Sequence, residues 1–227
     1  TFNSYSQPSV NAAGLIVFQG RASGSTVVHG IYGRDMLAAT PPFNITGMGT
    51  AVPPPNNTFY NGVLASFEAF PSVPRIDTSS PAMAVRGQSL PVYTYLLGAT
   101  ETRVGTSGVY ANPGGTLLTG ASLLGAVLEG GTLTFPHYSV PGATAGTRFD
   151  QFPGAATITN GSVIAYKGNY TDPSDGIGRT GVFYRDVLAS GGTSPTYEIA
   201  SSNTVIPNQP PGGTPGRPPG RGRAGRP

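Results

Sequence analysis

The chain has 227 residues, 37% of them hydrophobic and 10% charged, with 34 Gly, 23 Pro and no Cys. This composition excludes a disulfide scaffold, a thiolate metal site and a cysteine nucleophile, and no apolar run reaches the ~18 residues of a membrane-spanning helix. The formal net charge of +3 arises in the last eleven residues, which hold four Arg and no acid, so the remainder offers no broad field for nucleic acid or a membrane surface.

Three copies of one pattern follow one another along the chain. Each copy opens with two aromatic residues three positions apart, followed by a Pro and a polar turn. An apolar run that ends in Gly comes next, and after a loop each copy has Gly, an apolar residue and an aromatic. The aromatic pairs are Phe2 and Tyr5, Phe67 and Phe70, and Phe149 and Phe152. We therefore interpret residues 1–207 as a triplicated domain with units at about 2–66, 67–148 and 149–207.

The elements expected within each unit are β-strands. The run LIVF in 11–20 and the run VIAY in 159–168 are short, β-branched and aromatic, and turn residues bound them, which predicts strands. The segments GIYGRDML and GVFYRDVL, 30–37 and 181–188, match each other and also read as strands, although their period permits a helix. A helical alternative also stays open for 117–128, where two internal Gly weaken it.

These elements predict an all-β fold of three blade-like antiparallel β repeats, propeller-like or sandwich-like. A sheet of three or four strands cannot bury its faces alone, which is the physical reason for repetition. Three blades are fewer than the ~4–8 that usually close a propeller. The units are therefore expected either to form an open array or to close their edges against other subunits.

Residues 208–227 form a Pro/Gly/Arg-rich C-terminal tail without an apolar core of its own, and we expect it to be extended. A segment of this kind becomes ordered when something else holds it. The tail arginines are candidate contacts to a neighbouring subunit, through hydrogen bonds and proline stacking. They are Arg217, Arg221, Arg223 and Arg226.

Residues that could carry chemistry are few. His29 and His137 are the two histidines, and neither has metal-ligand spacing or a neighbouring carboxylate pair. Asp172 and Asp175 are only weakly calcium-like, because no Glu closes a twelve-residue loop. We expect the Arg-Asp pairs at 34–35 and 185–186 to tie a strand end to a loop within their own unit. We therefore expect no catalytic residue, no metal, no cofactor and no enzymatic activity.

Four Asn-x-Ser/Thr triplets are candidate N-glycosylation sites, on loops and strand edges, if the source glycosylates secreted proteins. They are Asn44, Asn56, Asn160 and Asn169.

The repeated core resembles tandem-repeat proteins whose signature is Asn-x-x-Gly-x-x-Ala-Phe. Asn11, Gly14, Val17 and Phe18 carry the resemblance in the first copy, the third copy keeps an Ala-Tyr pair at 165–166, and the second departs furthest. The family consists of secreted or surface-anchored proteins with propeller-like β repeats, and it carries no known catalytic residues. The resemblance implies the same fold and an extracellular or cell-surface location.

These observations favour a secreted structural protein that assembles with copies of itself into a homopolymer such as a filament or sheath, with the tail packed on a neighbour. The alternative is a carbohydrate-binding or adhesive module in which Tyr32, Tyr110 and Phe183, or aromatic residues of the loops, serve as platforms for glycans. A hydrolase with an acid pair not singled out by the sequence is a third hypothesis.

Overall fold

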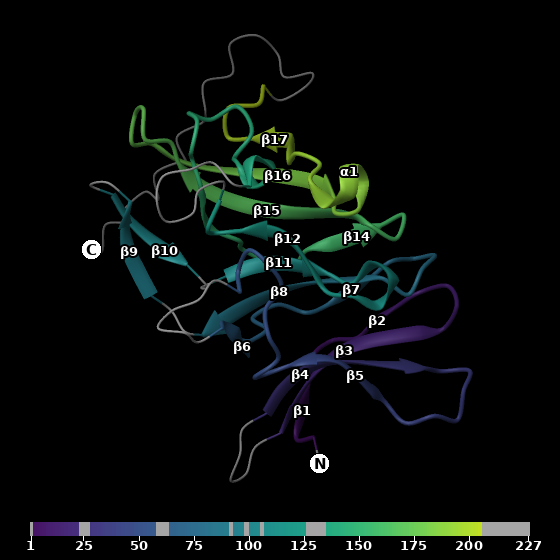
Figure 1. The fold of residues 1–227 in the computed structure, drawn as a ribbon. Coiled ribbons are helices and arrows are strands. Elements are labelled where there is room, and N and C mark those ends of the chain that lie inside the picture. The colour runs from purple at the N-terminus through teal and green to yellow at the C-terminus, as the bar shows by residue number, and fades with distance from the viewer. Residues whose placement is uncertain are drawn as a thin grey trace, which may run out of the picture.

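The computed structural model describes residues 2–22, 28–57, 64–90, 93–97, 100–104, 107–125 and 135–205. Within them the protein is all-β, and three antiparallel sheets are stacked one above the other (Figure 1). The predicted fold class is confirmed. The tail, including Arg217, Arg221, Arg223 and Arg226, lies outside the described residues.

The three sheets have the same strand order. The first runs β1–β3–β4–β5, with β2 also paired to β3. Its strands are β1 (Ser4–Tyr5), β2 (Ser9–Val10), β3 (Leu15–Ala22), β4 (Val28–Asp35) and β5 (Phe43–Gly47). Each sheet thus has two central strands, a closing strand on one side and two short pieces on the other.

The second and third sheets repeat this plan. The second consists of β6 (Ser66–Ala69), β7 (Arg75–Ile76), β8 (Met83–Leu90), β11 (Ser107–Ala111) and β12 (Leu118–Ser122). The third consists of β13 (Phe149–Gln151), β14 (Thr157–Thr159), β15 (Val163–Thr171), β16 (Gly178–Asp186) and β17 (Tyr197–Ser201). The strand interpretation of 30–37 and 181–188 is confirmed for β4 and β16. Of the segment 117–128, for which a helix stayed open, Leu118–Ser122 is a strand, and residues 126–128 lie outside the described residues.

The remaining elements are short. A separate hairpin of β9 (Tyr93–Leu97) and β10 (Thr100–Val104) lies in the chain between β8 and β11. Single-turn 3-10 helices span Pro113–Gly115 and Pro136–Tyr138, and α1 spans Ala189–Gly192. No helix in the described part of the chain is long and apolar enough to cross a membrane.

The sheets also share a local irregularity. The register between the second central strand (β4, β11 or β16) and the closing strand shifts at one point in each sheet. The shifts lie at Ile31/Tyr32, Val109/Tyr110 and Val182/Phe183. A β-bulge changes the direction of backbone groups locally, and its presence at the same place in three sheets marks it as a specific feature of the repeat. The common bulge gives a residue-by-residue correspondence among the three units.

Candidate functional site

Each sheet has two faces, which we name from its aromatic residues. The front face carries the aromatic pair with which the unit opens, and the back face is the opposite side. Successive side chains of a strand alternate between the faces, so in β8 Met83 and Val85 belong to the front and Ala84 and Arg86 to the back. In the second sheet both faces are buried, with Met83, Ala84 and Val85 all fully inaccessible.

Both internal junctions join a back face to a front face. At the first junction, Val17 and Ile31 from the back of the first sheet share one hydrophobic cluster with Phe67, Phe70 and Tyr110 from the front of the second. At the second junction, back-face residues of the second sheet share a cluster with front-face residues of the third. That cluster includes Ala84, Val109, Ala121, Phe149, Phe152 and Phe183. The chain therefore uses one mode of packing twice.

A polar contact recurs at the two junctions. Gln19 Nε2 donates a hydrogen bond of 2.8 Å to the carbonyl of Phe70, and the guanidinium of Arg86 donates to the carbonyl of Phe152. Gln19 and Arg86 each precede the Gly that ends the apolar run, so they occupy equivalent positions. A back-face donor therefore binds the carbonyl of the second aromatic of the following unit. Lys167, which precedes Gly168, is the third member of this set.

The polar turns also touch from unit to unit. The Oδ1 atom of Asn11 accepts the backbone N–H groups of Ala13 and Leu15, and its Nδ2 donates to the carbonyl of Ser80 at 3.0 Å. The turn of the second unit contacts that of the third in a similar way, because Asp77 accepts the N–H of Gly161. The Asn of the repeat signature thus closes its own turn and binds the following one.

Arg185 fastens the second and third sheets together. It is 1% exposed, and its Nη1 donates to the carbonyls of Thr119 and Gly120 in β12, at 3.2 and 3.0 Å. Its other nitrogens donate to the carbonyls of Ser194 and Gly192 in its own unit, and its guanidinium lies 4.9 Å from the ring centroid of Tyr138. Our expectation of ties within one unit is therefore incomplete, because this arginine also crosses to the preceding unit.

The aspartates of the two Arg-Asp pairs do stay within their units. Asp35 Oδ1 accepts the N–H of Leu37, and Asp186 Oδ1 accepts the N–H of Leu188. Arg34, which corresponds to Arg185, is exposed. Among the described residues no sheet lies in front of the first sheet, so Arg34 lies on an open surface there.

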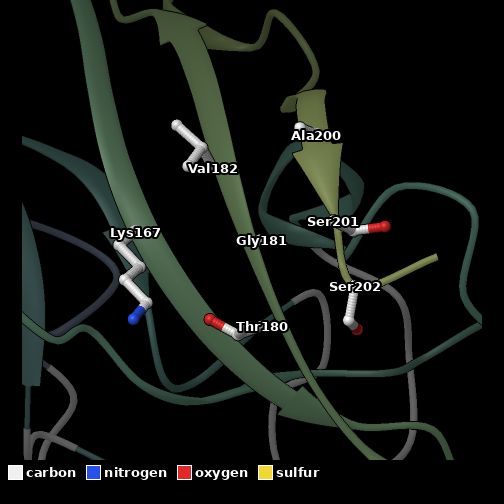
Figure 2. Close-up of a pocket in the computed structure, with 7 residues that line it drawn as sticks. All are labelled: Lys167, Thr180, Gly181, Val182, Ala200, Ser201 and Ser202. Carbon is white, nitrogen blue, oxygen red and sulfur yellow. The ribbon is translucent and has the colours of Figure 1, made fainter. Parts of the chain in front are cut away.

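In the part of the chain that the structure describes, stacking three sheets in this way leaves two open faces, the front of the first sheet and the back of the third. Along β15 and β16, buried residues alternate with more exposed ones, so one face of the third sheet is buried and the other is exposed. Figure 2 shows the back face, where Lys167, Val182 and Ala200 line a hollow of about 290 Å³ together with Ser202 in the turn after β17. Tyr184 and Tyr197 lie on adjacent strands of this sheet with their rings stacked 5.1 Å apart.

The structure revises two groups of predicted residues. Tyr110 and Phe183 are fully buried between sheets, so they cannot serve as glycan platforms, and only Tyr32 keeps partial exposure. Asn56 is 1% exposed, and its Nδ2 donates to the hydroxyl of Tyr110 at 2.8 Å. A glycan on that nitrogen is incompatible with the folded chain, so Asn56 is wrong as a candidate.

The other sequons differ in accessibility. Asn44 and Asn160 are exposed, whereas Asn169 is half-buried and its Oδ1 has no hydrogen-bond partner. Glycosylation of these three stays a prediction.

The carboxylate of Asp172 is held by hydrogen bonds within the protein. Its oxygens accept the N–H groups of Ser174 and Thr144, and these hydrogen bonds lower the pKa of the carboxyl. No cluster of three or more metal-ligating side chains occurs in the part of the chain that the structure describes.

His137 makes the second junction sensitive to acid. Burial, and then the nearby Arg185, lower the pKa of its imidazole to about 4. The unfolded chain, with an ordinary pKa near 6.5, binds this proton more readily than the folded chain does. The stability is therefore complete above pH ~6.5 and falls as the pH drops toward 4, by about 2 kcal/mol between pH 7 and pH 5. Urea unfolding at both pH values measures this loss.

The matched variants for this prediction are His137→Gln and His29→Gln. We expect the first to remove most of the acid sensitivity in that pH window and the second to retain it. An unchanged pH dependence in the His137→Gln chain would assign the acid sensitivity to another group.

Comparisons with known proteins add nothing to this description, because no protein-family model, curated protein or solved structure matches the chain. The resemblance to the Asn-x-x-Gly-x-x-Ala-Phe repeats stays a prediction.

Proposed function

We propose that this is a structural protein of the extracellular space or cell surface that assembles with copies of itself into a filament or sheath. One observation carries the proposal. The second sheet is covered on both faces by neighbouring sheets, whereas the described residues leave uncovered, on each outer sheet, one face of the kind that its neighbours bury. A set of stacked repeats that ends in two such faces is incomplete by its own packing rule.

The exposed residues on these faces support assembly. Large apolar side chains in contact with water gather on surfaces that associate with other molecules. On the third sheet these are Val182, Tyr184 and Tyr197, and on the first sheet Tyr5 and Val10. The composition, rich in Gly and poor in Lys, supports an extracellular location.

The purified chain is therefore expected to form species larger than 23.2 kDa, in a concentration-dependent way. Size-exclusion chromatography with light scattering measures their mass, and negative-stain imaging shows their form. A monomer across the whole accessible concentration range would overturn the proposal.

The tail has a separate place in this proposal, as an extended segment packed on a neighbour through its arginines. A chain that lacks residues 208–227 is expected to assemble less strongly in the same light-scattering assay. Unchanged assembly of the shortened chain would remove the tail from the proposal and leave the assembly itself.

A further inference from the structure

We propose that copies of this chain join head to tail, with the back of the third sheet of one copy seated on the front of the first sheet of the next. The junction between copies repeats the two junctions inside the chain, residue by residue. This inference rests on the proposed function, since it specifies how the copies assemble.

The apolar residues on the open front are the ones that the other units bury. Tyr5, Val10 and Met36 are 63%, 55% and 53% exposed. Their counterparts in the third unit pack against the second sheet and are buried: Phe152 is 2% exposed, Ile158 5% and Val187 2%. The front of the first sheet thus presents the same apolar set, and the back of another sheet is what covers that set within the chain.

The open faces also carry the donor and the acceptor of the polar contact that recurs at the internal junctions. Gln19 and Arg86 bind the carbonyls of Phe70 and Phe152, and the equivalent pair between copies is Lys167 with the carbonyl of Tyr5. Lys167 is exposed beside the hollow on the back of the third sheet (Figure 2). It is also the sole lysine of the sequence, so this amine can be tested specifically.

Arg34 fits the same scheme from the front side. Arg185 donates to the two carbonyls at the bulge of β12, those of Thr119 and Gly120. The bulge of β17 places the carbonyls of Glu198 and Ile199 at the corresponding positions. Arg34 of the next copy would donate to these carbonyls. In the single chain Arg34 is exposed, and the carbonyls that would cover it belong to another copy.

The backbone after the closing strand supplies an edge contact. After β5, the N–H of Met48 donates to the carbonyl of His29 and the N–H of Thr50 to that of Gly47; the backbone of 49–52 then pairs with 65–67 in the second sheet. After β17 the same turn forms, because the N–H of Ser202 donates to Thr180 and that of Thr204 to Ser201. Residues 203–205 are thereby set to pair with the backbone at Phe2 of the next copy, the counterpart of Phe67, which is β-strand addition.

A back-to-front contact is heterologous, because each copy uses two different surfaces. Such contacts close into a ring if the rotation per copy allows it and otherwise extend into a filament.

Cysteine cross-linking tests the register, because the chain has no Cys of its own. Ser202→Cys and Asn3→Cys in one chain place thiols on the two sides of the proposed junction and leave Tyr5, Lys167 and Arg34 intact. A bis-maleimide of about 10 Å span, the spacing of packed sheets, should then give a ladder of covalent multimers on a denaturing gel. Met48→Cys with Glu68→Cys is the matched control, because these residues are the internal counterparts and should link within one chain.

Two further variants test Lys167 in the Ser202→Cys, Asn3→Cys chain. Lys167→Gln keeps a donor of the type that Gln19 provides, so the ladder should persist. Lys167→Glu places a carboxylate against the carbonyl of Tyr5, and the multimer yield should fall at least tenfold.

The possible outcomes separate this inference from the proposed function. Large species in light scattering without a ladder, while the control pair links, would overturn the head-to-tail register and leave self-assembly standing. Covalent dimers from Ser202→Cys alone, again without a ladder, would mean that like faces pair and would also overturn the register. A chain that stays monomeric in light scattering would overturn both.

Discussion

Replacement of Arg185 by Met should lower the free energy of unfolding by about 3–5 kcal/mol. The residue is 1% exposed, and its hydrogen bonds to four backbone carbonyls join β12 to the last residue of α1 and to the loop that follows it. A methionine fills similar space but donates no hydrogen bond, so these buried carbonyls lose their partner. Urea unfolding of the dilute protein, followed by circular dichroism, measures the loss.

The control for this prediction is built into the repeat. Arg34→Met changes the corresponding residue of the first unit, which is exposed, and should alter the same free energy by no more than about 0.5 kcal/mol. Equal effects of the two substitutions would contradict the placement of the two arginines. In the assembly assay the order of importance is expected to reverse, because Arg34 lies on the open front.

This pair of arginines also shows what the sequence can and cannot predict. The match of GIYGRDML to GVFYRDVL predicts two strands in equivalent places, and the structure has them as β4 and β16. Whether the arginine of each segment is buried depends on a neighbouring sheet that is distant in sequence. No local pattern carries that information, so the second contact of Arg185 could not be predicted.

The aromatic residues follow the same logic. Their spacing predicts the three units, but it does not tell a buried Tyr110 from a half-buried Tyr32. The interpretation of these rings as glycan platforms is therefore wrong for Tyr110 and Phe183, which are buried, and stays a prediction for Tyr32. Asn56 is a comparable case. Its triplet fits the glycosylation sequon, but its side-chain amide is buried and donates a hydrogen bond to the hydroxyl of Tyr110.

The order of stacking is the part of the candidate site that the sequence left open. Blade-like units with uncovered edges are expected from the repeat, but packing of back on front depends on which face of each strand is apolar. The second unit is apolar on both faces of β8, at Met83, Ala84 and Val85. Such a run is typical of a strand buried on both sides, but LIVF in the first unit and VIAY in the third are equally continuous, so these runs do not show which unit lies in the middle.

The glycines under the aromatic rings provide the second large effect. Gly87→Ala should lower the free energy of unfolding by about 2–3 kcal/mol, the cost of overpacking a tight core. A Cβ atom at Gly87 would lie 2.6 Å from Phe67 Cε1 and 3.0 Å from Tyr110 Cε2. Both rings are held in the cluster between the first two sheets and cannot move aside. Thermal and urea unfolding of the purified variant measure the effect.

The equivalent change in the first unit has a different expected result, although the local geometry is alike. A Cβ atom at Gly20 would lie 2.7 Å from Phe2 Cε1, but Phe2 is half-buried on the open front and can rotate away from it. The gain from a less flexible unfolded chain then offsets the crowding, and Gly20→Ala should change the stability by less than about 1 kcal/mol. A loss as large as that of Gly87→Ala would show that the front of the first sheet is already covered in the single chain, which would remove the surface on which the next copy is proposed to sit.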